Sequence, residues 1–227
     1  MTSRKPLGFK SGPMVWIDLE MSGLNPRTDK ILEIAASYQI VDEGLQYIIR
    51  TDKRVLDGWV LTSSHYLLRR DVWEVFRMDE WCTNQHGKSG LTKACLQSPY
   101  STEFVTKSVL DYIKKWVPDQ RTAVLAGNSV HVDRTFLAAE MPEIVDWLHY
   151  RIVDVSSIKE LARRWYPAEK QAPRPAETNH RALDDIRGSI RGSTQHFRSL
   201  SKTLTAMLRI EMVSRKSLHP TPRTKPE

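Results

Sequence analysis

The chain has 227 residues, of which 40% are apolar and 27% charged, so it is long enough for one globular domain with a sizeable core. Its formal net charge of +7 favours an anionic partner. No apolar run approaches the roughly 18 residues that span a membrane, and Cys82 and Cys95 show neither metal-ligand nor disulfide-framework spacing. These features argue against a membrane protein and favour a reducing, intracellular compartment over secretion.

Both ends of the sequence read as extensions of a domain predicted over residues 14–205. Residues 1–13 are basic and contain no acid, as in transit peptides, but they lack an amphipathic turn. The compartment therefore stays open between cytoplasm and mitochondrion. Residues 206–227 end in a basic, proline-rich stretch with a single apolar side chain, which predicts a disordered tail.

The first half of the domain predicts three antiparallel strands. An apolar run opens at Val15, and residues 31–41 and 45–51 follow as two further strands separated by a short turn. Residues 122–127 then form a short apolar run closed by a glycine, which we read as a buried strand.

The second half predicts helices alternating with strands. A helix over 131–141 ends at a proline, a strand covers 151–155, and Ser157 with Glu160 has the spacing of a capping box for a helix that ends near residue 165. Residues 166–179 form a proline-rich loop before a final helical pattern over 180–200. These elements together describe an α/β fold, a mixed sheet covered by helices.

The opening strand carries an unexpected pair of acids. Asp18 and Glu20 alternate with Ile17 and Leu19, so the two carboxylates share one face of the strand. Such a pair is costly unless a cation lies between them, and carboxylate oxygens are typical ligands of hard divalent cations. The alternative is an edge-strand or solvent-exposed face.

Three further positions extend the acidic set. Asp133 lies one helical turn before Leu137, on the side expected to meet the core, although it could be a first-turn acid favoured by the helix dipole. Asp184 and Asp185 flank the apolar face of the last helix, and periodicity alone does not choose between them or exclude a solvated face. His180 precedes that helix, where a capping or surface role is the alternative.

Three segments carry a resemblance to a known family. WIDLEMSGL (16–24), GNSVHVDRTFL (127–137) and HRALDDIRGSI (180–190) resemble the three motifs of the His-containing DEDD 3′-to-5′ exonucleases, and in particular the oligoribonuclease family. The resemblance extends from about residue 14 to about residue 200. It implies a ribonuclease H-like fold and hydrolysis of very short RNA oligonucleotides to nucleoside 5′-monophosphates.

The resemblance also implies roles for individual residues. Two Mg²⁺ or Mn²⁺ ions would be held by Asp18, Glu20, Asp133 and Asp185, with the motif spacing selecting Asp185, and His180 would be the general base. Substrate would be bound by a second group: Leu24 as a wedge, Trp81 as a stacking platform, and Ser129, Arg151 and Ser156 at the 5′ phosphate, with Tyr150 supplied by the partner in a homodimer. Without the resemblance, Leu24 and Trp81 would equally suit core packing, and Tyr150 and Arg151 would be strand-edge residues.

The sequence departs from the family pattern at residues 59–77. These residues separate two segments that run together in relatives, and they contain two tryptophans and several other apolar residues. They could form an extra helix over the substrate groove, but we favour a translated intron, which sequencing of the mature transcript would test. The insertion leaves the position of Trp81 open.

Two other functions compete with the leading one. A broader 3′-to-5′ exonuclease acting on DNA or longer RNA would use the same acids, and a catalytically silent nucleic-acid binding module would not require the complete set. The complete set of acids with His180 argues against the silent module. The cap formed by Ser129, Tyr150 and Arg151 argues against long substrates.

Overall fold

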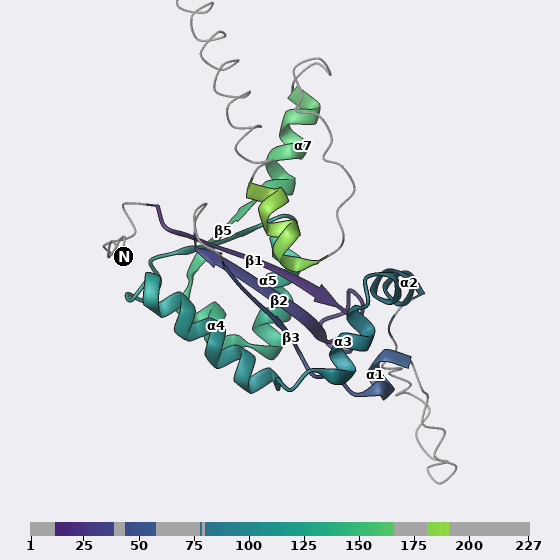
Figure 1. The fold of residues 1–227 in the computed structure, drawn as a ribbon. Helices are drawn as coiled ribbons and strands as arrows, with labels where there is room; N and C mark the ends of the chain where they lie inside the picture. Colours follow the sequence, from purple (N-terminus) through teal and green to yellow (C-terminus); the bar gives the residue numbers. More distant parts are fainter. Residues whose placement is uncertain (1–11, 39–43, 58–77, 79, 166–180, 191–227) are drawn as a thin grey trace, which may run out of the picture.

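The computed structural model describes residues 12–38, 44–57, 78, 80–165 and 181–190 (Figure 1). Several predictions fall elsewhere in the chain: the segment 59–77, the loop 166–179, His180, the extension 206–227 and most of the extension 1–13 lie outside the described residues.

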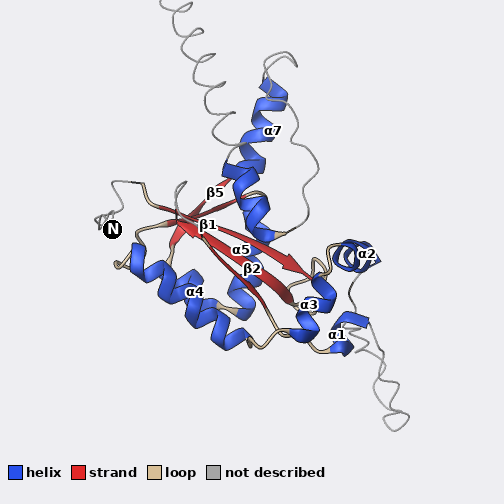
Figure 2. Cartoon of the chain, viewed as in Figure 1, coloured by secondary structure: helices blue, strands red, loops and turns tan. Residues whose placement is uncertain are grey.

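A mixed five-stranded sheet forms the centre of the molecule (Figure 2). Its strand order is β3-β2-β1-β4-β5, and the strands are β1 (Met14–Met21), β2 (Ile31–Tyr38), β3 (Leu45–Ile48), β4 (Val124–Gly127) and β5 (His149–Asp154). The first three strands pair antiparallel, whereas β4 pairs parallel with both β1 and β5. The predicted meander and the two later strands are confirmed, and β1 lies in the middle of the sheet.

Helices cover both faces of this sheet. They are α1 (Lys53–Asp57), α2 (Glu80–Lys88), α3 (Leu91–Gln97), α4 (Thr102–Trp116), α5 (Val130–Glu140), α6 (Pro142–Trp147), α7 (Val155–Trp165) and one further helix over residues 182–190. Pro142 ends α5 as predicted and also begins α6, because proline is well tolerated in the first turn of a helix. Within the described part of the chain, no helix is long and apolar enough to cross a membrane.

The predicted capping box at Ser157 is wrong. Helix α7 begins two residues earlier, at Val155. The carboxylate of Asp154 accepts hydrogen bonds from the backbone N–H of Ser156 at 2.9 Å and from its hydroxyl at 2.7 Å. An aspartate cap therefore precedes the Ser-x-x-Glu spacing and starts the helix, since any Asp or Ser in that stretch can satisfy free helical N–H groups.

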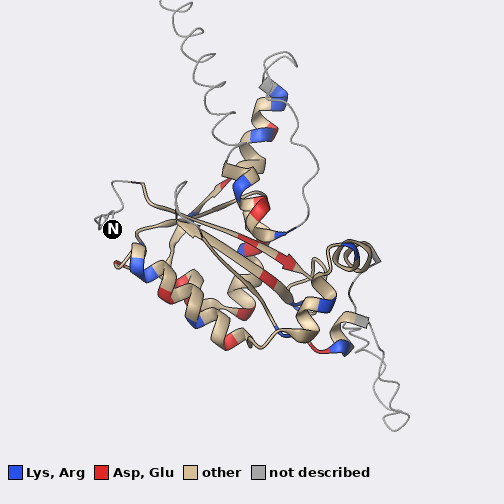
Figure 3. Cartoon of the chain, viewed as in Figure 1, with Lys and Arg blue, Asp and Glu red and all other residues tan. Residues whose placement is uncertain are grey.

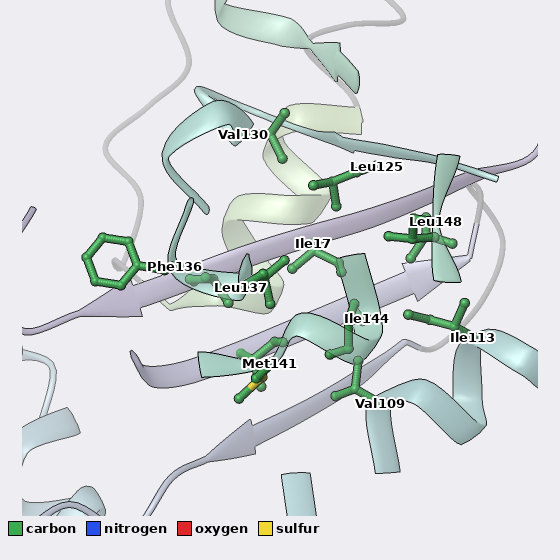
Figure 4. Packing of buried hydrophobic residues seen from close by; sticks show 14 of the residues in the cluster. Ile17, Val109, Ile113, Leu125, Val130, Phe136, Leu137, Met141, Ile144 and Leu148 are labelled. Atoms are coloured by element: carbon green, nitrogen blue, oxygen red, sulfur yellow. The ribbon is translucent and has the colours of Figure 1, made fainter. Parts of the chain in front are cut away.

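The two faces of β1 have different surroundings. Its odd-numbered side chains, Val15, Ile17 and Leu19, pack in the main apolar core with helices α4, α5 and α6, and Figure 4 shows Ile17 in this cluster. Trp16 faces the other way and packs with Ala182 and other residues of the 182–190 helix. The even-numbered side of β1 therefore points toward the 182–190 helix, which Figure 1 shows beside α7 in light green.

A third, smaller cluster fixes α2 and α3 near the end of β1. Leu32 of β2 packs there with Cys82 of α2 and with Leu91 and Cys95 of α3. Both cysteines are buried, and neither forms a disulfide. The cluster brings α2, which carries Trp81, to the same end of the sheet as the acids of β1, since the imidazole Nε2 of His86 lies 2.9 Å from the carbonyl oxygen of Met21.

Candidate active site

Three carboxylates meet where β1 faces the 182–190 helix. Asp18, Glu20 and Asp185 each offer an oxygen, and these oxygens all lie within 4.8 Å of one another. Asp18 and Glu20 come from alternate positions of β1, so the face they share is the one that the 182–190 helix covers. The structure therefore brings together three of the four predicted acids as one cluster. Figure 3 marks acidic positions in red on β1 and on the helix beside it.

The structure also separates Asp185 from Asp184. Asp184 is exposed, and its carboxylate lies 3.4 Å from the guanidinium of Arg187 on the outer side of the helix. Ala182 and Ile186 are buried against the sheet, which turns Asp185 toward the acids of β1. Helical packing thus makes the choice that periodicity alone left open.

A hydrogen bond from the backbone of β1 holds the carboxylate of Asp133 next to the site. Asp133 lies in the first turn of α5, only 6% exposed, and its Oδ1 accepts a hydrogen bond from the N–H of Leu19 at 2.9 Å. Leu19 is the residue between Asp18 and Glu20. Asp133 is therefore held beside the cluster, but its carboxylate is not one of the three that meet within 4.8 Å.

Burial and mutual repulsion make these carboxylates hard to ionise. Burial, followed by the negative charge of Asp133 and its neighbours, raises the pKa of Asp18 well above its ordinary value. Burial and the charge of Asp185 raise the pKa of Glu20 to about 8. Burial also raises the pKa of Asp133 to about 7, although the hydrogen bond from Leu19 opposes the shift.

The donor set suits a hard divalent cation. The three groups that meet in the cluster are carboxylates, and oxygen donors of this kind bind Mg²⁺, Mn²⁺ or Ca²⁺ rather than softer metals. A bound cation would replace the proton that the raised pKa values otherwise favour. The residues present therefore fit a divalent metal.

Leu24 and Trp81 lie on the surface. Leu24 is 74% exposed and Trp81 is 58% exposed, which excludes the alternative of core packing. The turn that carries Leu24 is held by Asp29, whose carboxylate accepts from the hydroxyl of Ser22 at 3.0 Å and from the N–H of Asn25 at 2.8 Å. Gly23 faces this carboxylate so closely that an added Cβ would lie 2.5 Å from an oxygen, so the turn requires glycine.

Ser129 and Ser156 meet at one carboxylate. Oδ1 of Asp154 accepts from the N–H of Ser129 at 2.9 Å and from both the N–H and the hydroxyl of Ser156. Its Oδ2 lies 3.2 Å from Nδ1 of His131. This hydrogen bonding supports the left-handed backbone of Ser129, which has φ 54°, and brings the starts of α5 and α7 together.

Tyr150 and Arg151 lie on β5, the strand at one edge of the described sheet. Tyr150 is 71% exposed, its ring stacks on His149 with a centroid separation of 4.5 Å, and the guanidinium of Arg151 lies 5.4 Å from its centroid. The pair is a strand-edge feature within this chain. Its predicted contact with a partner subunit is not tested by a single chain.

Glu33 and Arg181 are among the polar groups of the site that were not predicted from the sequence. Glu33 is a fully buried acid in β2, and Arg181 binds it from the start of the 182–190 helix. The signal for Glu33 was available, because it is a lone charged residue in the otherwise apolar start of a predicted strand, ILEIAAS. Nothing in the sequence indicated that Arg181 would be its partner.

Solved structures share this fold. Exonuclease I from Methylocaldum szegediense is 13% identical with a TM-score of 0.54, and the alignment covers 82% of this chain and 40% of that one. The zinc-bound complex of E. coli exonuclease I with single-stranded DNA is 12% identical with a TM-score of 0.55, covering 86% and 43%. The chain thus spans less than half the length of these proteins, and the likeness is one of fold.

Sequence comparison gives the family. A family model described as exonuclease, RNase T, matches residues 73–191, more than half of the chain. This match, the mixed sheet and the carboxylate cluster define the class as an exonuclease with a ribonuclease H-like fold.

The chain is 44% identical over 187 residues to a probable oligoribonuclease of Schizosaccharomyces pombe, covering 82% of this chain and 68% of the relative. It is 43% identical over 189 residues to the oligoribonuclease of Pseudoalteromonas translucida (81% and 93%) and 41% identical over 184 residues to the mitochondrial oligoribonuclease of Bos taurus (78% and 69%). The chain belongs to the oligoribonuclease family.

Proposed function

We propose that this protein is a 3′-to-5′ exoribonuclease that hydrolyses very short RNA oligonucleotides to nucleoside 5′-monophosphates. The observation that carries the proposal is the convergence of Asp18, Glu20 and Asp185 in a member of the oligoribonuclease family. The net charge of +7 suits a polyanionic substrate.

The acids would hold two Mg²⁺ or Mn²⁺ ions. When bound, the ions activate a water molecule and stabilise the departing 3′ oxygen. Asp18, Glu20 and Asp185 supply oxygens from a preformed cluster, and the hydrogen bond to Leu19 holds Asp133 in a fixed orientation beside it. We assign the general base to His180, because motif spacing places it at the start of the segment that carries Asp185.

Short substrates would be held at two ends. Leu24 would wedge against a base and Trp81 would stack on one, and the exposure of both side chains supports these roles. Ser129, Arg151 and Ser156 would bind the 5′ phosphate, for which the hydroxyl of Ser156 would turn away from Asp154. Tyr150 of one subunit would close the phosphate site of the other subunit, which requires a homodimer through β5. A site closed in this way would exclude an RNA strand that continues beyond the 5′ phosphate.

One cleavage assay tests the activity with a matched control. The substrates are a 5′-labelled RNA dinucleotide and a longer RNA, with Mg²⁺ or with a chelator, and the proteins are the wild type, Asp185→Asn and Asp184→Asn. Asp184 neighbours Asp185 but pairs with Arg187 on the outer face, so its variant should retain activity within about twofold. Asp185→Asn should abolish cleavage of the dinucleotide.

The outcomes separate the competing functions. Mg²⁺-dependent cleavage of the dinucleotide alone supports the proposal, whereas comparable cleavage of the long RNA indicates a broader exonuclease. Binding without cleavage by the wild type indicates a silent binding module. Sedimentation of the wild type as a monomer would remove the role proposed for Tyr150.

We also propose a cytoplasmic or mitochondrial location, supported by the mitochondrial relative in Bos taurus. Fractionation of cells that express the tagged full-length chain tests this location.

A further inference from the structure

An additional buried acid lies next to the carboxylate cluster. Glu33 is 0% exposed, and all eight residues of β2 are buried. It lies directly opposite Glu20 in the antiparallel pairing of β1 with β2. Directly opposed residues of an antiparallel pair project from the same face, so Glu33 adds a negative charge to the face that already carries Asp18 and Glu20. A carboxylate in this position is costly unless a cation binds it.

Arg181 is that cation. Its Nη2 donates to Oε1 of Glu33 at 2.8 Å, and its Nε lies 3.2 Å from both carboxylate oxygens. The side-chain amide of Gln46 on β3 also donates to Oε1 of Glu33. A guanidinium that engages both oxygens of a buried carboxylate is held in both position and orientation.

Arg181 also starts the helix that carries Asp185. The backbone carbonyl of Arg181 accepts from the N–H of Asp184 at 2.9 Å and from the N–H of Asp185 at 3.1 Å. Its side chain binds β2 while its main chain forms the first turn of the 182–190 helix. The ion pair therefore ties the start of that helix to the sheet, across 148 residues of sequence.

The apolar contacts of this helix with the sheet fix its position less closely. Ala182, Ile186 and Ile190 pack against Trp16 and Ala35, and apolar packing is non-directional. A small shift or rotation of the helix would keep these contacts but would move the carboxylate of Asp185 away from Asp18 and Glu20. Metal affinity is sensitive to such shifts, because removing a group that orients a metal ligand typically costs roughly 10- to 100-fold in affinity.

We propose that Glu33 and Arg181 form a positioning pair that sets Asp185 at the distance from Asp18 and Glu20 needed to bind a divalent cation. This inference rests on the proposed function and adds to it two residues that do not bind the metal or the substrate. It distinguishes Arg181 from Arg187, which lies on the same helix and pairs with the exposed Asp184.

The test uses the full chain with four variants: Glu33→Gln, Arg181→Gln, the double variant, and Arg187→Gln as the control. Each single change at the pair should raise the Mg²⁺ concentration for half-maximal dinucleotide cleavage roughly 10- to 100-fold, with KM at saturating Mg²⁺ unchanged. The double variant should resemble the single variants, because both remove the same interaction. Arg187→Gln should match the wild type.

A second readout needs neither metal nor substrate. Hydrogen exchange of the 182–190 helix in chelator should be faster in Glu33→Gln and Arg181→Gln than in Arg187→Gln, because the first turn loses its attachment to β2. Equal exchange in all three variants would overturn the proposal, even if the wild type proved inactive and the proposed function had failed.

Two further results would also overturn it. A raised KM in Arg181→Gln alone would make Arg181 a substrate-binding residue. A lower melting temperature in both single variants with an unchanged Mg²⁺ requirement would make the pair purely structural. If Glu33→Gln fails to fold, Arg181→Lys provides the test, because lysine keeps the positive charge but cannot contact both carboxylate oxygens with a planar guanidinium. This variant should need a Mg²⁺ concentration between those of the wild type and Arg181→Gln for half-maximal cleavage. The same Mg²⁺ concentration as the wild type would refute the role of the bidentate contact.

Discussion

Removing the charge of Glu20 should change how stability depends on pH in the metal-free protein. Burial and the charges of Asp185 and Glu33 raise the pKa of Glu20 from 4.5 to about 8. Between these values the folded protein keeps a proton that the unfolded chain has released. The proton on Glu20 therefore stabilises the folded protein fully at pH values below the pKa of this group in the unfolded chain. This stabilisation is lost as the pH rises toward the pKa of Glu20 in the folded protein.

The expected size follows from this interval. The free energy of unfolding should fall by at most about 1.4 kcal/mol per pH unit through this group. This amounts to roughly 2.5 kcal/mol between about pH 5.5 and pH 7.5, because near the upper pH the folded protein also begins to release the proton. Glu20→Gln removes the titration. The stability of the variant relative to the wild type should therefore increase by that amount over the same range.

Urea unfolding in chelator at several pH values measures this difference. Titrating groups outside the carboxylate cluster largely cancel when the two proteins are compared at each pH. Added Mg²⁺ should stabilise the wild type more at about pH 7.5 than at pH 5.5, because protons compete with the metal for the carboxylates more strongly at the lower pH. Parallel stability curves for the wild type and Glu20→Gln would refute the raised pKa of Glu20 in the folded protein.

Three further predictions concern single contacts. Asp133→Asn and Asp133→Ala should both abolish cleavage. Only the alanine variant should have a lower free energy of unfolding in urea, by about 1–3 kcal/mol, because it leaves the N–H of Leu19 without its acceptor. An equal loss of unfolding free energy in both variants would refute the role of that hydrogen bond. Trp81→Ala should raise KM for a dinucleotide by roughly 10- to 100-fold in steady-state kinetics, with an unchanged melting temperature because the side chain is 58% exposed; an unchanged KM would remove the stacking role. Asp154→Ala should lower the melting temperature, because the N–H of Ser129, in a strained left-handed turn, loses its hydrogen-bond acceptor. A scanning calorimetry trace identical to that of the wild type would contradict this.

The parts of the fold that the sequence predicted are those governed by local periodicity. The meander follows from apolar runs separated by a turn, and the side-by-side position of Asp18 and Glu20 follows from the alternation of a strand. The family motifs added the choice of Asp185, and helical packing supports it independently, because Ala182 and Ile186 face the sheet.

The parts that escaped prediction depend on contacts between distant segments. The partner of Glu33 comes from a residue far along the chain, and no local pattern indicates such a pairing. The start of α7 was misplaced because Asp154 and Ser157 both suit a cap, and only the bonds of Asp154 to Ser156 and Ser129 decide between them. Local chemistry allowed both positions, and tertiary structure selected one.

The carboxylate cluster draws its members from opposite ends of the domain, and this has a consequence for synthesis of the protein. Asp18 and Glu20 leave the ribosome early, whereas Asp185 and its helix emerge only after the whole sheet has been made. The nascent chain therefore carries two of the three clustered carboxylates until Asp185 is made. Any product that stops short of residue 185 lacks the third, so the proposed metal site is complete only once the 182–190 helix has been synthesised.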